Sequence, residues 1–401
     1  MNILFIGKSC PLKTASEILQ KSGKNPGYQI IKFIDLILKG FVKNGHTLNV
    51  LSNVSNPNCT FSFPKKKYEN EICYKYLPVI RIPIISQLLH TFYSFFYVLF
   101  WGITTKGDKI ILCDIFASSS SNGAVRAARL LNIFTSMILT DMIATPVTTL
   151  NSHNNWWWTL FFKFRVKSQY KSITKFDSYV FLTKYMNEAY NSLNKPYVVM
   201  EGSVDSSFVS LKDCKKNIPR VVMYAGAIEA EYGFNELVKA FMLLSMQDIE
   251  LHIYGNGKFV ETLLEYQKLD SRIKYMGVVS NDKIVEAEQK ATLLVNPRLS
   301  NQEFVKYSFP SKTSEYMLSG TPLLTTKLCG IPDEYFDYLY TFEDESVMGF
   351  YEKLNEILSL SDRELCVKGE EAQSFVLKNK NNVVQAKRLI DFFLQIIKSK
   401  L

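Results

Sequence analysis

Glycines and polar residues follow four predicted strands in the second half of the chain, at the points where the strands end. These strand ends are Ala225-Gly226-Ala227, Gly255-Asn256-Gly257, Gly277 and Asn296-Pro297-Arg298. In open α/β sheets ligands bind beyond the carboxyl ends of the strands, and glycine lets backbone N–H groups approach a phosphate closely. Each glycine alone is equally compatible with a tight turn. Their recurrence favours a nucleotide site that includes Gly226, Gly255 and Gly257.

A second polar group begins a predicted helix in residues 303–322, EFVKYSFPSKTSEYMLSGTP. We expect Ser311 to cap the helix N-terminus, where free N–H groups and the helix dipole favour anions. Lys312 would add a positive charge for a phosphate, and Glu315 would accept hydrogen bonds from a ribose diol. The alternative is that Ser311 only caps the helix and Glu315 only completes its first turn.

The elements that must position these residues follow an alternating pattern. The first half has a strand at 2–6, a polar glycine-containing loop at 7–29, a helix at about 29–44 and a strand at 46–51. Further strands are predicted at 109–113, 136–139, 178–182 and 197–200. The second half has strands at 220–224, 250–254, 273–276, 291–296 and 322–326, with helices at 234–244, 258–269, 283–289 and 311–318. Strands alternating with helices predict parallel sheets, and therefore an α/β protein of two doubly wound domains.

Composition narrows the function classes. The formal net charge of +9 favours acidic partners such as nucleotide phosphates or anionic lipid, and we expect no nucleic-acid binding. The seven cysteines form no CxxC pair, which indicates reduced thiols rather than a disulfide framework or a zinc site. The N-terminal run MNILFIG has no basic segment before it and is predicted to be a strand rather than a signal peptide. No DxD motif flanked by apolar strands indicates a metal site, so none is expected.

Two stretches could contact a membrane. Residues 84–103, IISQLLHTFYSFFYVLFWGI, are long and uncharged enough to span one. However, their polar residues recur three to four apart, and a span would separate strands 2–6 and 109–113, which we expect in one sheet. We therefore predict a core or surface-associated helix. Residues 155–175 combine three tryptophans with many basic residues, as expected either for a membrane interface or for a packed helix with a solvated basic face.

The ordered set of motifs resembles the family 4 (group 1) glycosyltransferases of the GT-B fold. The resemblance is carried by YAGAIEAEYGFNELVKAF (224–241), LHIYGNG (251–257), the Gly277 strand end, LLVNPR (293–298) and YSFPSKTSEYMLSGTP (307–322), with YVVMEGSVDSSF (197–208) similar to the interdomain segment. It implies two Rossmann-like domains facing across a cleft. Residues 1–204 would bind the acceptor and 205–381 the nucleotide-sugar donor, with a C-terminal helix in 382–401 packing back on the first domain.

The chain departs from the family pattern at three positions. Members usually carry two glutamates separated by seven residues in the donor site; Glu315 matches the second, but the first falls on Tyr307. Glu303, four residues earlier, is the candidate replacement. The Arg and Lys that usually hold the diphosphate fall on Ala227 and Tyr232, so Arg298 and Lys312 are the candidates for that charge.

The resemblance also places the acceptor side in the first half. Gly27, Tyr28 and Gln29, after the first strand, would contact the acceptor. Asp114 and Asp141 follow apolar strands, and with Glu303 they are the catalytic candidates. Each aspartate could equally be a helix-capping residue.

Together these observations predict a cytoplasmic glycosyltransferase, acting with retention and without a metal or cofactor. Its donor would be a nucleoside-diphosphate sugar, UDP- or GDP-linked by analogy. Its acceptor would be lipid-linked or a glycan, as in capsule or O-antigen biosynthesis, and it would associate peripherally with an anionic membrane surface. The alternatives are a nucleotide-sugar epimerase of the same fold and a non-catalytic subunit of a polysaccharide-assembly complex.

Overall fold

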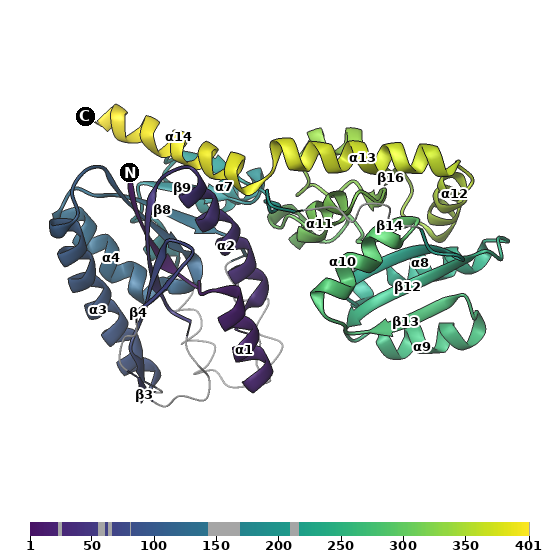
Figure 1. The fold of residues 1–401 in the computed structure, drawn as a ribbon, viewed down its shortest axis with the longest axis horizontal. Helices are drawn as coiled ribbons and strands as arrows, with labels where there is room; N and C mark the ends of the chain where they lie inside the picture. Colours follow the sequence, from purple (N-terminus) through teal and green to yellow (C-terminus); the bar gives the residue numbers. More distant parts are fainter. Residues whose placement is uncertain are drawn as a thin grey trace. The chain divides into compact units, whose positions relative to one another are not determined.

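The computed structural model describes residues 1–22, 26–54, 61–62, 66–80, 82–142, 169–208 and 216–400. The chain forms two compact units. Unit 1 comprises Met1–Met200 and Asn382–Leu401, and unit 2 comprises Glu201–Asn381. The chain therefore passes from one unit to the other twice, and both termini belong to unit 1 (Figure 1).

Unit 1 is built on an eight-stranded sheet in the order β10-β9-β8-β7-β1-β2-β5-β4. Every neighbouring pair is parallel except β4 and β5. The strands are β1 (Asn2–Gly7), β2 (Thr47–Ser52), β4 (Lys66–Glu69), β5 (Ile72–Tyr76), β7 (Lys109–Asp114), β8 (Phe134–Leu139), β9 (Ser178–Phe181) and β10 (Tyr197–Val199), with a separate antiparallel pair β3 (Phe61–Ser62) and β6 (Val79–Ile80). The central strands β1, β7 and β8 are buried almost throughout because helices cover both faces of the sheet.

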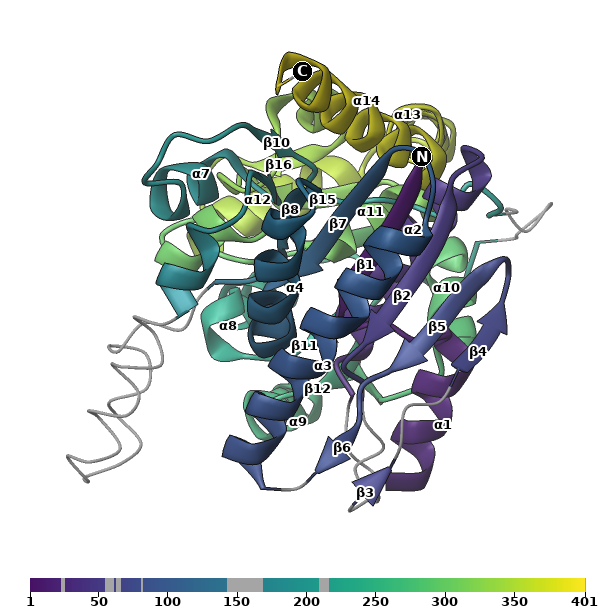
Figure 2. The ribbon, with the colours of Figure 1, turned by 90° about the vertical axis from the view of Figure 1, so that its left-hand side faces the viewer.

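Helices cover the two faces of this sheet in pairs (Figures 1 and 2). On one face, α2 (Tyr28–Lys43) packs with the C-terminal helix α14 (Asn382–Lys400), whose Leu389 and Phe393 lie in the same core as the strands. A Cβ atom at Gly40 of α2 would lie 2.1 Å from the Asn382 carbonyl oxygen, so only glycine permits this approach. The C-terminal helix thus returns to the first domain, as predicted.

The other face carries α3 (Pro83–Thr104) and α4 (Ser118–Leu130), which is preceded by the 3₁₀ turn η1 (Ile115–Ala117). Gly123 of α4 lies against the Thr91 carbonyl of α3. A shorter helix, α7 (Lys184–Tyr190), follows β9. Within the described residues no helix is long and apolar enough to cross a membrane. Residues 84–103 instead form a helix packed on α4.

One element of unit 1 was not predicted. Helix α1 (Leu12–Ser22) occupies part of the segment expected to be a polar loop, so that prediction is wrong for these residues. Leu12, Ala15 and Ile18 recur at spacings of three and pack on a small core that includes Cys10. Only four of the 11 residues of α1 are apolar, and packing against α2 supplies the rest of the stability.

Unit 2 is built on six parallel strands in the order β13-β12-β11-β14-β15-β16. They are β11 (Arg220–Ala227), β12 (Ile249–Asn256), β13 (Ile273–Gly277), β14 (Leu293–Asn296), β15 (Leu323–Thr326) and β16 (Tyr340–Phe342). The chain moves outward from β11 to β13 and then returns to β14, so the order reverses between β11 and β14. This reversal point is where ligands bind in doubly wound sheets.

Two apolar cores hold helices to the faces of this sheet. One involves α8 (Phe234–Leu243), α9 (Val260–Leu269) and α12 (Val347–Leu358). The other involves α10 (Asn281–Lys290), α11 (Ser311–Ser319) and α13 (Asp362–Asn379). The 3₁₀ turns are η3 (Ala230–Tyr232), η4 (Glu303–Tyr307) and η5 (Asp333–Tyr338). Helices α12 and α13 and strand β16 were not among the predicted elements.

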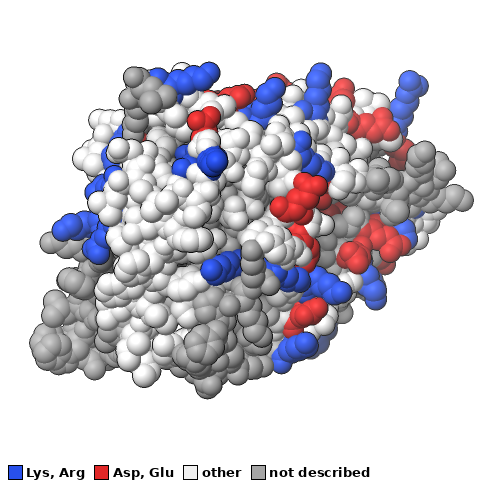
Figure 3. Space-filling view, turned by 60° about the vertical axis from the view of Figure 1, so that its left-hand side comes forward, with Lys and Arg blue, Asp and Glu red and all other residues white. Residues whose placement is uncertain are grey.

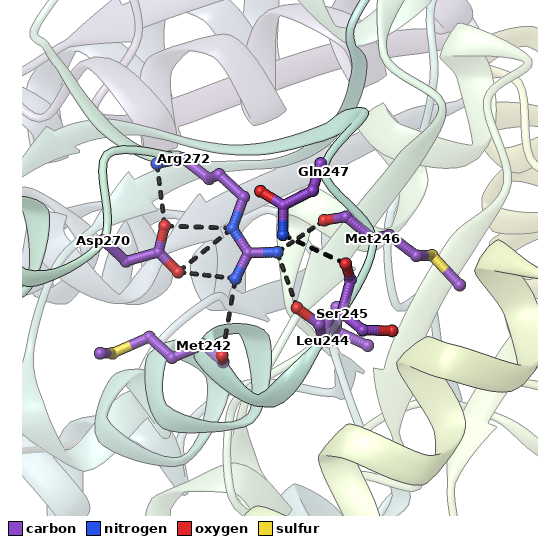
Figure 4. Close-up of polar contacts among 7 residues, drawn as sticks. All are labelled: Met242, Leu244, Ser245, Met246, Gln247, Asp270 and Arg272. Carbon is purple, nitrogen blue, oxygen red and sulfur yellow. Dashed lines mark hydrogen bonds and ion pairs between the residues drawn. The ribbon is translucent and has the colours of Figure 1, made fainter.

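Arg272 anchors the end of α8 (Figure 4). Its guanidinium donates to the carbonyl oxygens of Leu244, at 2.7 Å, and Met246, at 2.6 Å, and pairs with the Asp270 carboxylate at 2.7 Å. The hydrogen bonds from Arg272 hold the Asp270 pKa below its usual value. Because carbonyls at a helix end lack partners within the helix, this cation satisfies them and fixes the connection from α8 to β12.

Candidate functional site

The predicted donor-site glycines lie at the carboxyl ends of neighbouring strands in unit 2. Gly226 of β11 pairs with Gly255 of β12. A Cβ atom at Gly255, whose φ is 130°, would lie 1.8 Å from the Gly226 carbonyl oxygen, and one at Gly257 would lie 2.1 Å from the Ile228 carbonyl oxygen. The close approach of the two strand ends therefore explains why Gly255 and Gly257 are glycines, independently of any ligand.

Tyr316 ties helix α11 to the same edge. Its hydroxyl accepts a hydrogen bond from the Ala225 amide at 2.7 Å and lies 3.1 Å from the Ala225 carbonyl oxygen. The side chain is fully buried, and burial raises the Tyr316 pKa well above its ordinary value. This contact holds the first turns of α11 beside the end of β11, and sequence reasoning missed it.

Arg298 is a cation at the end of β14 that pairs with no carboxylate among the described residues. Its guanidinium lies 4.2 Å from the centre of the Tyr232 ring and 5.4 Å from that of Phe304. The buried Nε atom has no hydrogen-bond partner within the described part of the chain. Leaving a buried donor unsatisfied costs about 1–3 kcal/mol, so the arrangement suits an anionic ligand that would accept from it.

Tyr232 belongs to the turn η3 before α8, and Phe304 to the turn η4 before α11. The turn before α8 is set by Gly233, whose φ is 74° and where a Cβ atom would lie 2.1 Å from the Pro297 carbonyl oxygen. The loops after β11 and β14 are thus in contact. They bring Arg298 against Tyr232, one of the two positions at which the resembled family usually carries a cation.

Lys312 and Glu315 lie together at the start of α11, as predicted, but they pair with each other. The Lys312 Nζ atom is 2.7 Å from a Glu315 carboxylate oxygen and 3.9 Å from one of the buried Glu288. Burial lowers the Lys312 pKa, but the Glu315 and Glu288 carboxylates outweigh it, so the pKa is raised overall. Lys312 therefore stays protonated, with its charge balanced by Glu315 and Glu288.

Ser311 does not cap α11 as expected. Pro310 occupies the N-cap position, which has no side-chain cap, and Ser311 is the exposed first residue of the helix. Proline is common at helix starts because it lacks the N–H that would otherwise be unsatisfied. The prediction of a Ser311 cap is therefore wrong. The first turn of the helix contains no acidic residue that would repel an anion.

Glu303 and Tyr307 begin and end the turn η4. A 3₁₀ helix has three residues per turn, so side chains four residues apart point about 120° away from each other. Glu303 is exposed and shares its direction with Lys306, whereas Tyr307 is half-buried. The Glu303 side chain therefore points in a different direction from a side chain at position 307. To replace the missing glutamate, it would have to contact the ligand from another side.

In unit 1, Asp114 and Gly27 lie around the loop after β1. Asp114 is fully buried and accepts a hydrogen bond from the Lys8 amide. Burial raises the Asp114 pKa to about 6, partly offset by the backbone N–H donors around it. A Cβ atom at Gly27, whose φ is 85°, would lie 2.7 Å from the Lys8 Nζ atom, and the adjoining Tyr28 and Gln29 begin α2.

Three residues that sequence reasoning missed line the carboxyl edge of the unit 1 sheet. Ser9, Asn53 and Thr140 follow β1, β2 and β8 and each has a buried oxygen without a hydrogen-bond partner among the described residues. Together with Asp114, the last residue of β7, they lie at the ends of four neighbouring strands. Their position after the end of a strand is the one signal in the sequence, and it does not show that their oxygens are buried and unpaired. Such atoms suit a ligand rich in hydroxyl groups.

The remaining predicted residues do not belong to either of these groups of side chains. Asp141 is exposed, and its carboxylate lies 2.8 Å from the Met142 amide. Most of residues 155–175, including Trp156, Trp157 and Trp158, lies outside the described residues, so its membrane role stays a prediction. A cavity of about 450 Å³ between α10 and strands β11 and β12, lined by Glu250, His252 and Lys283, contains none of the predicted site residues.

Residues 219–360, within unit 2, match the family model described as Glycosyl transferases group 1. No curated protein is significantly similar to the chain in sequence. Among solved structures, the chain is similar to a sucrose-phosphate synthase from Thermosynechococcus elongatus, with 13% identity, complete coverage of both chains and a TM-score of 0.65.

Two further structures were solved with ligands. HepE from Anabaena, in complex with UDP, has 13% identity, covers 98% of this chain and 100% of its own, and has a TM-score of 0.62. An α,α-trehalose-phosphate synthase (UDP-forming) from Burkholderia xenovorans, in complex with glucose-6-phosphate, has 10% identity, covers 98% and 99%, and has a TM-score of 0.63.

At these identities the structural likeness establishes the fold. It is the GT-B fold of two Rossmann-like domains with parallel sheets. The activity class comes from unit 2, through its match to the group 1 family. The chain is a glycosyltransferase with the GT-B fold.

Proposed function

We propose that the protein transfers a sugar from a nucleoside-diphosphate sugar, with retention and without a metal ion, to a lipid-linked or polysaccharide acceptor. Unit 2 binds the donor and unit 1 binds the acceptor. The reaction belongs to the assembly of cell-surface polysaccharide, such as capsule or O-antigen, on the cytoplasmic face of a membrane. The UDP complex of HepE supports a nucleotide donor, with UDP or GDP as the nucleotide carried.

The observation that carries the donor assignment is Arg298. This cation stacks on Tyr232 at the carboxyl edge of the unit 2 sheet and retains a buried donor without a partner in the described residues. A diphosphate supplies both the missing charge and the missing acceptor. The N-terminal end of α11 acts on the same diphosphate, because the positive end of the helix dipole favours anions.

Lys312 and Glu315 bind different parts of the donor. When the donor binds, the ammonium of Lys312 adds its charge to the phosphate side, and Glu315 accepts from the ribose diol. Lys312 stabilises the negative charge that develops on the departing nucleoside diphosphate, and Glu315 fixes the position of the ribose. Gly226, Gly255 and Gly257 keep side chains away from this edge of the sheet.

On the acceptor side, Asp114 and the buried oxygens of Ser9, Asn53 and Thr140 form the polar surface that orients the acceptor hydroxyl. Gly27, Tyr28 and Gln29 border it. Asp141 and Glu303 are the further catalytic candidates, and both carboxylates are exposed.

The test is a product analysis of the full chain with UDP- and GDP-sugars and a membrane extract as the acceptor source. Transfer should consume the donor, release the nucleoside diphosphate and label an acceptor. Release of an epimerised nucleotide sugar without an acceptor would replace this proposal with the epimerase alternative. Nucleotide binding without any turnover on any donor would favour a non-catalytic subunit.

A further inference from the structure

Helix α3 exposes a continuous apolar face to solvent. Its large hydrophobic side chains on this face are between 47% and 72% exposed, and they are Ile85, Leu88, Phe92, Phe96, Phe100 and Ile103. Their spacings of three and four residues place them on one side of the helix, over about 27 Å at 1.5 Å per residue. No described residue covers this face, and an exposed apolar surface of this size is typical of a binding surface.

The orientation of α3 is fixed by its opposite side. Ser94, Val98 and Trp101 are buried against the rest of unit 1. The Ser94 hydroxyl donates to the Ser120 carbonyl of α4 at 2.7 Å, and the Thr91 hydroxyl donates to the Ser119 carbonyl at 3.0 Å. Two of the polar residues that recur along the helix, Thr91 and Ser94, therefore bind α4, and the apolar face points away from the core.

Basic side chains border this face. Helix α3 itself contains no Asp, Glu, Lys or Arg. Lys75 lies over the rings of Tyr93 and Tyr97, the neighbouring row on α3, at 5.7 and 4.8 Å. Exposed Lys106 follows the end of the helix.

A second group of cations lies on α4 and the segment before β9. Arg126 and Arg129 are exposed on α4, and the Arg129 guanidinium donates to the Lys175 carbonyl at 3.0 Å. Burial lowers the Lys175 pKa, and Arg126, Arg129 and Lys171 lower it further, so the four cations are close together. On the face drawn in Figure 3, a broad area carries no charged side chains, and Lys and Arg side chains lie along its margin together with some Asp and Glu.

We propose that the exposed face of α3, with its basic border, binds the surface of an anionic lipid bilayer. This inference rests on the proposed function, because it names the surface by which an enzyme with a lipid-linked acceptor reaches its substrate. The helix lies in the plane of the interface, its aromatic side chains among the acyl chains and its basic neighbours at the headgroups. A second copy of the chain fits less well, because a two-fold contact through α3 would bring the like-charged borders together.

The test is co-sedimentation of the full chain with vesicles of phosphatidylglycerol and phosphatidylcholine, or of phosphatidylcholine alone. The variant replaces Phe92, Phe96 and Phe100 with serine. Its matched control replaces three equally exposed apolar residues of unit 2, Leu243, Leu269 and Met348, with serine. A single Phe96→Glu variant, which puts a charge on the apolar face, checks the result with less disturbance of the helix.

The wild type and the control should bind the anionic vesicles more tightly than the neutral ones, and added salt should weaken that binding. The triple phenylalanine variant should partition at least about tenfold less, because three buried aromatic side chains are lost, and Phe96→Glu should also weaken binding. Equal binding by the wild type and both α3 variants would overturn the proposal. So would a wild-type dimer that ignores vesicles and dissociates in the triple variant.

Titration of UDP and GDP into the same samples separates this inference from the proposed function. Both triple variants should bind nucleotide as the wild type does, since α3 belongs to unit 1. Nucleotide binding without vesicle binding would contradict only the membrane proposal. Vesicle binding without nucleotide binding would contradict only the proposed function.

Discussion

The guanidinium of Arg298 lies 4.2 Å from the centre of the Tyr232 ring, and this stack joins the loop after β14 to the loop after β11. A tyrosine at position 232 has no charge to offer a diphosphate, but its ring face attracts and orients a cation. We propose that Arg298 supplies, from another strand, the charge that the resembled family carries after its first strand in this domain. The departure of the sequence at Tyr232 is therefore compatible with donor binding.

The Lys312–Glu315 pair should govern donor affinity. We expect Glu315→Gln to weaken donor binding about ten- to a hundredfold through loss of a charge-assisted hydrogen bond, and Lys312→Ala to lower both binding and turnover. Lys353 and Glu356 of α12 form a matched control, because they have the same spacing and the same 2.7 Å separation. Calorimetry and initial rates of the four variants check this. Equal affinities and rates in Glu315→Gln and the wild type would remove Glu315 from the donor site.

The Glu303→Gln variant tests whether Glu303 is a catalytic carboxylate or only an exposed surface one. If it replaces the glutamate that is absent at Tyr307, Glu303→Gln should reduce kcat by at least about tenfold while donor affinity changes little. Exposed Glu352→Gln on α12 is the control and should leave both unchanged. Equal kcat values for Glu303→Gln and Glu352→Gln would show that Glu303 has no catalytic role.

Asp114 should make stability depend on pH. Its folded-state pKa, about 6, is above the ordinary aspartate value of 3.8, so the folded protein holds this proton more tightly than the unfolded chain. The corresponding stability is fully present below about pH 4 and is lost as the pH rises to about 6, by on the order of 3 kcal/mol. Urea unfolding of the wild type, Asp114→Asn and the exposed control Asp141→Asn at pH 4 to 7 measures this.

The wild type should lose stability relative to Asp114→Asn over that interval, whereas Asp141→Asn should follow the wild type. Parallel curves for all three proteins would show that Asp114 does not hold a proton in the folded state.

Arg272 should matter for folding rather than for catalysis. Arg272→Ala leaves Asp270 and the carbonyls of Leu244 and Met246 without their cation, and we expect a loss of about 2–4 kcal/mol in unfolding free energy. The exposed Arg363→Ala on α13 should change stability by less than about 0.5 kcal/mol. Denaturant titration checks both variants. A wild-type midpoint for Arg272→Ala would mean that these bonds add nothing to stability.

The fold was predictable where the hydrophobic pattern was strong. Helix α2 was evident because apolar residues recur along its whole length, and the C-terminal helix for the same reason. Helix α1 was missed because Leu12, Ala15 and Ile18 give a weak pattern that only contact with α2 makes stable.

The sequence predicted where the site lies, at the ends of the strands, but not how its side chains contact each other. Lys312 and Glu315 were expected near each other, but three-residue spacing on a helix does not say whether two charges pair or bind a ligand. The cap at Ser311 failed because Pro310 already sets the backbone of the helix start. Ser9, Asn53 and Thr140 could not be singled out, because their buried, unsatisfied oxygens depend on how loops from separate strands pack.

The most direct test of a donor site in unit 2 is calorimetric titration of UDP and GDP into the wild type, Arg298→Gln and the control Arg363→Gln. Glutamine keeps polar atoms at position 298 but removes the charge that stacks on Tyr232. The account predicts that the wild type and Arg363→Gln bind one of the two nucleotides with the same affinity, and that Arg298→Gln binds it about ten- to a hundredfold more weakly. Equal affinity of all three proteins would contradict the account.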